Sequence, residues 1–220
     1  MRMPRELDAV EIRVLGCLLE KEQTTPDAYP LSVNALVGAC NQKSNRDPVM
    51  RLSAGDVEAT LDRLHAEVMV WPVEGARTRK WRHSLDRKWE LTPEKRAVLT
   101  VLLLRGAQTS GEIRARTERM HSFGDKGQVQ EVLDGLATRG VPLVIRLPHL
   151  PGHKEARYAQ LLSGTPEAEA AAVQQDRQPI QISATEDARH IAELQETVAS
   201  LEARITALET ELAGFRRQFE

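Results

Sequence analysis

The segment from residue 77 to residue 88 has the composition best suited to chemistry in this chain, because cations gather there around a tryptophan. Six cations stand against one acid, Asp86, while Trp81 lies among them and Trp89 follows. The cations are Arg77, Arg79, Lys80, Arg82, Arg87 and Lys88. This density of positive charge suits contacts with nucleic-acid phosphates. A solvated hairpin whose tryptophans pack on their own domain would have the same residues, so both interpretations stay open.

A second group of candidate contact residues lies outside this segment. Lys43 and Arg46 could extend the positive surface. Gln128 and Gln130 fall in an expected helix, and a glutamine amide can pair with the edge of adenine. The candidate DNA-contact residues are therefore Arg77, Arg79, Lys80, Arg82, Lys43, Arg46, Gln128 and Gln130.

The helix expected after Ser53 disfavours ordinary major-groove recognition by the first half of the chain. Its acids outnumber its one cation, Arg63. These acids are Asp56, Glu58, Asp62 and Glu67. Phosphates would repel such a helix, so we expect DNA contacts from the hairpin cations and from the later helix that carries the glutamines.

No motif in the sequence supports catalysis. The histidines are scattered; His149 and His153 are close, but they flank a Pro-Gly turn and have no third ligand beside them. Cys17 and Cys40 lie on apolar helical faces, as reduced core cysteines do. The glycines near residue 125 lack the Gly-Lys-Ser/Thr ending of a phosphate loop. We therefore predict a protein that is not an enzyme and has no metal or cofactor.

The C-terminal tail carries an uninterrupted heptad pattern. Apolar residues occupy the a positions Ile191, Val198, Ile205, Leu212 and Phe219, and the d positions Leu194, Leu201, Leu208 and Phe215. β-branched residues at a with leucine at d favour a parallel two-stranded coil. The tail over residues 184–220 therefore predicts a homodimer. The same stripe could instead pack on the chain's own domains or on another protein.

Composition sets limits on the class of protein. The 220 residues suit two small domains, and 41% apolar with 28% charged residues is ordinary for a soluble protein. A net charge of −2 disfavours a strongly basic nucleic-acid binder, so the distribution of charge must decide. Neither a membrane-spanning segment nor a signal peptide is recognisable, and we expect a cytoplasmic protein without membrane contact.

The first half, residues 1–90, reads as three helices followed by a hairpin. Apolar spacing predicts helices over residues 7–22 and 31–40, and a third begins at Ser53. The segments 69–75 and 79–85 are rich in valine and tryptophan and are typical of paired strands. Three helices and a hairpin are the elements of a winged helix.

The second half, residues 91–163, repeats that order. Thr92 and Pro93 open a helix that ends at Gly106, and Thr109 with Glu112 forms a capping box for the next. A third helix runs from Asp125 to Gly140, before strands at 142–148 and 155–162. We expect a mainly α protein with small β-hairpins: two tandem winged-helix domains, a linker over 164–183 and a C-terminal coiled-coil helix.

Three segments resemble a known family: TPDAYPLSVNALVGACNQKSNRDPVM, LLLRGAQTSGEIRAR and LPGHKEARYAQLLSG. They are similar to the YceH-like family of bacterial tandem winged-helix proteins, whose function is unassigned. The resemblance implies the fold and a bacterial cytoplasmic setting, and it implies no activity. Two hypotheses follow: a dimeric winged-helix DNA-binding protein of the kind that regulates transcription, or a non-enzymatic scaffold that binds other proteins.

Overall fold

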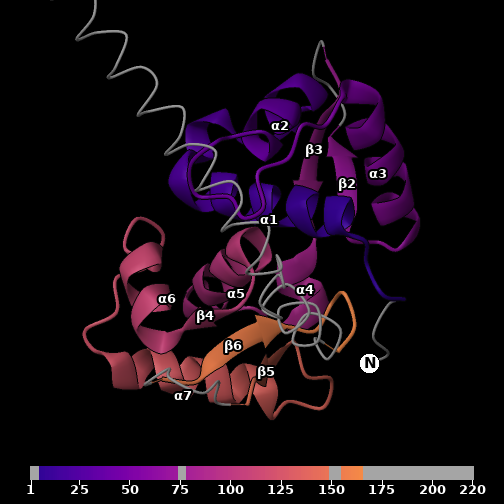
Figure 1. The fold of residues 1–220 in the computed structure, drawn as a ribbon. Helices are drawn as coiled ribbons and strands as arrows, with labels where there is room; N and C mark the ends of the chain where they lie inside the picture. Colours follow the sequence, from indigo (N-terminus) through magenta and orange to yellow (C-terminus); the bar gives the residue numbers. More distant parts are fainter. Residues whose placement is uncertain (1–4, 74–77, 149–154, 166–220) are drawn as a thin grey trace, which may run out of the picture. The chain divides into compact units, whose positions relative to one another are not determined.

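The computed structural model describes residues 5–73, 78–148 and 155–165 (Figure 1). These described residues form one compact unit of α-helices and small antiparallel sheets. The predicted coiled coil, with every heptad residue from Ile191 to Phe219, lies outside the described residues, as does all of the predicted linker beyond Thr165. In the described part of the chain, no helix combines the length and hydropathy needed to cross a membrane.

Eight elements occur among the described residues of the first half. They are α1 (Ala9–Thr24), a 3-10 turn (Pro26–Ala28), β1 (Leu31–Ser32), α2 (Val33–Cys40), α3 (Ala54–Ala66), β2 (Val70–Val73), β3 (Lys80–His83) and α4 (Leu85–Trp89). Its antiparallel sheet has the order β1-β3-β2. The three helices and the hairpin agree with the sequence prediction. β1 and α4 were not predicted, because two and five residues are too few to show a period.

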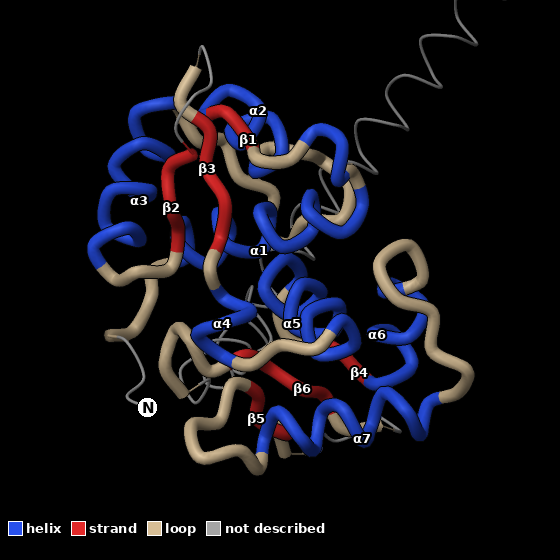
Figure 2. Tube along the Cα trace, turned by 180° about the vertical axis from the view of Figure 1, so that it is seen from behind, coloured by secondary structure: helices blue, strands red, loops and turns tan. Residues whose placement is uncertain are grey.

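The second half repeats the order of the first. Its elements are α5 (Pro93–Arg105), β4 (Gln108–Thr109), α6 (Ser110–Thr117), α7 (Lys126–Ala137), β5 (Val144–Arg146) and β6 (Arg157–Gln160). The sheet order β4-β6-β5 matches that of the first half. Figure 2 shows one sheet beside α3 and the other beside α7. This arrangement is compatible with winged helices, and the division into two domains at residue 90 stays a prediction.

Side-chain caps set several helix starts. At α6, Thr109 and Glu112 form the predicted capping box, and the Asp125 carboxylate caps α7 as expected. Asp8 and Glu11 form a further capping box, so α1 begins at Ala9 rather than at Leu7. The prediction that Gly140 closes α7 was wrong. The helix ends at Ala137, and at the C-cap the Thr138 backbone N–H donates to the Asp134 carbonyl.

The two halves share one hydrophobic core, and its centre is the contact between α1 and α5. Gly16 on α1 faces Leu103 and Leu104 of α5; a Cβ at Gly16 would lie 2.8 Å from Leu104 Cδ2 and 3.1 Å from Leu103 Cβ. The absent side chain therefore allows the helices to approach closely. The Leu7 N–H donates to the Leu162 carbonyl (2.8 Å), which joins the start of the first half to the end of the second.

We predict that Gly16→Val lowers the free energy of unfolding by about 2 kcal/mol, because an inserted side chain overpacks the α1–α5 contact. Gly38→Val is the matched control, since Gly38 is an exposed helical glycine with open space around its Cβ position. The control is expected to change the free energy of unfolding by less than about 0.5 kcal/mol. Urea denaturation measures both, and equal effects of the two substitutions would contradict the close-approach argument.

Candidate nucleic-acid interface

The hairpin of β2 and β3 presents three of the described cations of the basic segment, while Arg87 and Lys88 lie on α4. Arg79 and Arg82 are exposed and Lys80 is half-buried, whereas Arg77 lies outside the described residues. No acid in the described part of the chain forms an ion pair with Arg79, Lys80 or Arg82. Hereafter these three are the hairpin cations. Their charge is therefore available to an external anion.

The tryptophans of the basic segment serve the core rather than a ligand. Trp81 and Trp89 are buried. Alternation along β3 turns Trp81 inward while Arg82 points outward, and Trp89 shares the buried side of α4 with Leu85. This is what the solvated-hairpin interpretation expects of them. The exposed aromatic is Trp71 on β2, 42% exposed and paired across the strands with Arg82. Strand alternation beside the buried Val70 was the signal that could have identified it.

Trp71 borders a hollow of about 760 Å³ between the hairpin and α4. Val68, 51% exposed, lies at its rim with a left-handed backbone (φ 58°), which is unusual for a β-branched residue. Cations also line the hollow: Arg82, Arg87 and Lys88. The Lys88 ammonium already donates to the Glu67 carbonyl (2.5 Å). The hollow thus joins an apolar rim to a positive wall.

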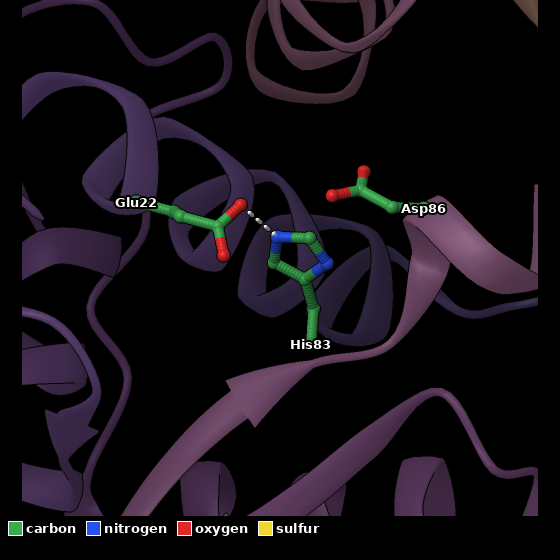
Figure 3. A group of neighbouring side chains, drawn as sticks. All are labelled: Glu22, His83 and Asp86. Carbon is green, nitrogen blue, oxygen red and sulfur yellow. Dashed lines mark hydrogen bonds and ion pairs between the residues drawn. The ribbon is translucent and has the colours of Figure 1, made fainter. Parts of the chain in front are cut away.

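Glu22, His83 and Asp86 are among the residues that line this hollow. Figure 3 shows their side chains close together, with the His83 ring facing the Glu22 carboxylate. The His83 Nδ1 accepts the Leu85 N–H (3.3 Å), so Nε2 carries the proton and donates to Glu22 Oε2 (2.8 Å). Arg96 from α5 bridges the two carboxylates: its Nη1 lies 2.7 Å from Glu22 Oε2 and 2.8 Å from Asp86 Oδ2.

This group has the donor types of a metal site, and its ligand atoms lie within 4.8 Å of one another. The Arg96 guanidinium, however, already supplies the positive charge between the carboxylates. Burial raises the pKa of Glu22, but the hydrogen bond from His83 and the hydrogen bond and charge of Arg96 outweigh burial and lower it. The residues therefore fit a structural network that ties α1 to α4 and α5. Sequence reasoning missed the group because its members come from four separate elements.

The exposed face of α3 is acidic, as the sequence indicates. Glu58 and Asp62 are exposed and, with Arg79, line a hollow of about 480 Å³ between α3 and the hairpin. The one cation of this helix, Arg63, pairs with Asp8 (2.9 Å) and Glu11 (3.1 Å). Because Arg63 already pairs with acids of α1 and its N-cap, no unpaired cation among the described residues of α3 offsets the repulsion between its acids and a phosphate.

The candidate glutamines of α7 make contacts within the protein. Gln130 Nε2 donates to Asp134 Oδ1 (2.9 Å) and to the Tyr158 hydroxyl (2.6 Å), so its amide hydrogens are engaged. Gln128 is exposed, and its carbonyl oxygen accepts the Gly124 N–H (2.9 Å). No hydrogen bond described for Gln128 uses its side-chain amide nitrogen. Of the two glutamines, Gln128 is therefore the one that can donate to a base.

Arg46 is not on the basic surface, and the structure corrects that expectation. Its side chain is 0% exposed and forms a two-pronged contact with Glu20 (3.0 and 2.6 Å), while its Nε donates to the Ala39 carbonyl (3.0 Å). A planar guanidinium satisfies a carboxylate and a carbonyl together, which allows it to be buried. Lys43 is exposed, but it lines a different hollow from the hairpin cations.

We predict that Glu20→Gln lowers the free energy of unfolding at pH 7 by about 3–5 kcal/mol, because it leaves the buried Arg46 charge uncompensated. Burial raises the pKa of Glu20, but Arg46 outweighs it and the pKa is lowered in the folded state. The stabilisation is therefore present above the unfolded-state pKa of about 4.3 and is lost as pH falls through the folded-state value.

The two proteins should accordingly converge in stability on acidification, as urea denaturation at pH 7 and pH 3 will measure. Glu58→Gln, at an exposed site on α3 without a described partner, is the control and should leave stability nearly unchanged. A constant difference between Glu20→Gln and the unaltered protein at both pH values would contradict this account.

Comparison with known proteins places the chain in a family. The family described as "Protein of unknown function, DUF480" matches residues 7–153. A "UPF0502 protein" of Geobacter metallireducens is 48% identical over 219 residues, covering 99% of this chain and 100% of the relative. One from Geotalea daltonii is 54% identical over 165 residues, covering 74% of this chain and 76% of the relative. The predicted membership of a bacterial family without an assigned function is confirmed: the chain belongs to the DUF480/UPF0502 family.

Proposed function

We propose that this protein is a dimeric, non-enzymatic DNA-binding protein with two tandem winged helices, and that the hairpin cations hold the phosphate backbone. The observation that carries the proposal is the free charge of Arg79, Lys80 and Arg82 on one hairpin. In contrast, Arg46, Arg63 and Arg96 all have acid partners. Cations that lie at the wing position and have no acid partner are suited to bind an external polyanion.

The order of elements supports this assignment. A helix, a short strand, two helices and a hairpin occur in each half, and the hairpin of the first half holds the position of a wing. Acids on α3 would repel DNA and so disfavour contacts between this helix and the bases. Most of the affinity for DNA should therefore be independent of its sequence. Gln128 on α7 is the candidate for any base contact. The proposal places the protein in the cytoplasm, where bacterial DNA is found.

A protein-interaction scaffold is the second candidate, and one observation favours it. Trp71 and Val68 leave a large apolar surface at the rim of the hairpin hollow, beside Arg82. Tryptophan and arginine are the residues that most often dominate protein interfaces. On this alternative, substitution of Trp71 would abolish capture of a protein partner, and substitution of the hairpin cations would leave duplex binding absent or unchanged.

We predict that Arg79→Ala/Arg82→Ala weakens binding to all duplex sequences and reduces the slope of log K against log salt by about 2 per protomer, since each lost phosphate contact removes about 0.9. The control Arg51→Ala/Lys95→Ala removes the same charge from residues outside the hairpin and should alter the slope little. Fluorescence anisotropy with a labelled 20-base-pair duplex from 50 to 200 mM salt measures both. Absent duplex binding at 50 mM salt would favour the scaffold.

We also predict that a chain ending at Thr165 is a folded monomer, because the heptad stripe from Ile191 to Phe219 would be gone while the shared core stays complete. Its duplex affinity should fall by roughly 100-fold, since two linked binding units gain from effective concentration. Light scattering reports the mass and thermal melting reports the fold. A truncated chain that remains dimeric would contradict dimerisation through the tail.

A further inference from the structure

A second positive surface lines a hollow of about 740 Å³ that shares no lining residue with the hairpin. Its walls come from the end of α1, the loop over residues 42–45, α5 and the end of α6, so both halves contribute. Figure 1 shows α5 and α6 beside each other below α1. We name it the basic hollow after its cations, which are Lys21, Lys43, Arg105, Arg116 and Arg119.

The basic hollow holds more positive charge than its own acids can balance. Glu20 and Glu118 are the acids in its lining. Glu20 is already engaged by the buried Arg46 guanidinium, and Lys21 shares it at 3.3 Å. Among the described residues, Lys43 and Arg119 have no ion-pair partner. The lining therefore carries an excess of free cations.

Like charges are crowded at the side of α5. Burial lowers the pKa of the Arg105 guanidinium, and the positive charges of Arg116 and Arg46 lower it further, an effect that Asp47 and Glu20 offset only in part. Groups held at such an unfavourable spacing destabilise the protein unless an anion lies between them. This agrees with the geometry, in which cations from four segments line one hollow.

The walls of the basic hollow are fixed before any ligand binds. The Asp47 N–H donates to the Leu104 carbonyl (2.9 Å), which holds the loop against α5. Asn45 has a left-handed backbone (φ 60°) and accepts a hydrogen bond from Arg105. The side chains of Gln42 and Ser44 make none of the hydrogen bonds described within the protein and can donate to a ligand. A preformed site of this kind loses little conformational entropy on binding.

We propose that the basic hollow binds a multiply charged phosphate anion, through contacts from both halves of the protein. Five cations exceed what a single monoanion would need, and three of them are arginines, whose planar fork matches phosphate oxygens. The volume suits a small-molecule ligand. The phosphates of a soluble polyphosphorylated molecule and those of a nucleic-acid backbone present the same chemistry. This inference is independent of the hairpin cations.

Titration of the full chain with orthophosphate, pyrophosphate and tripolyphosphate at matched ionic strength tests the proposal. Affinity by calorimetry is expected to rise at least tenfold from orthophosphate to tripolyphosphate, and the melting temperature to rise by several degrees. Sodium chloride at the same ionic strength should produce no such rise. Equal effects of the three phosphates and of chloride would overturn the proposal.

Matched variants distinguish a binding site from general charge. Lys43→Gln/Arg116→Gln should weaken tripolyphosphate binding at least tenfold, while Lys95→Gln/Arg51→Gln, at positions outside the hollow, should not. The first variant relieves like-charge crowding and loses only the partly exposed Arg116–Glu112 ion pair (3.4 Å), which contributes little to stability. Its melting temperature without ligand should therefore be close to or above that of the unaltered protein. Loss of stability without loss of affinity would show a structural role and overturn the proposal.

Competition identifies the source of the phosphates. If a 20-base-pair duplex displaces tripolyphosphate, the hollow holds nucleic-acid backbone; if both bind together, it holds a small molecule. Arg79→Ala/Arg82→Ala should keep full tripolyphosphate affinity, which makes failure of this proposal distinguishable from failure of the proposed DNA binding. Tripolyphosphate affinity lost with the hairpin cations and kept in Lys43→Gln/Arg116→Gln would place the anion at the hairpin and overturn the inference.

Discussion

Close packing of α1 against α5 is the constraint on which the rest of the described structure depends. Helices approach this closely only where a side chain is small, and Gly16 meets that requirement opposite Leu103 and Leu104. Each half alone is small and has a limited core. Joined through these helices, the halves share one core and form one compact unit. The basic hollow exists because of this contact, since its walls come from both halves.

Buried arginines fix the loop that follows α2. Arg13 donates to the carbonyls of Cys40 (3.1 Å) and Pro48 (2.5 Å), and Arg46 holds the Ala39 carbonyl together with Glu20. If either side chain moved away, a buried carbonyl or carboxylate would lose its hydrogen-bond partner, which is costly. The loop therefore holds Lys43 in a fixed position. In this way the buried guanidinium groups of Arg13 and Arg46 stabilise the loop that carries the exposed Lys43.

The described cations fall into two groups, those that pair with an acid and those that do not. Arg46, Arg63 and Arg96 join separate elements through acids. The pKa values of Glu11, Glu20 and Glu22 are lowered because the hydrogen bonds and charges of their partners, which include His83 for Glu22, outweigh burial. The hairpin cations and Lys43 lack such partners among the described residues. The net charge of −2 conceals this division, because the paired acids and arginines cancel in the sum.

Local signals in the sequence determined most of the helix starts and both hairpins. Capping residues such as Thr109 and Asp125 act on neighbouring backbone N–H groups, and alternation of burial in strands has a short period, so both can be recognised from adjacent residues. Family membership likewise followed from continuous segments. β1, β4 and α4 escaped prediction because elements of two and five residues show no period.

Only the tertiary structure decided which charged residues are free. Arg46 and Lys43 are three positions apart and equally polar, yet one is buried against Glu20 and the other is exposed at the basic hollow. Glu22, His83, Asp86 and Arg96 meet from four elements, which no spacing in the chain indicates. Charge interactions depend on distance in space, and burial depends on what packs above a residue. Both quantities are set by long-range contacts, among them that of α1 with α5, rather than by neighbours in the chain.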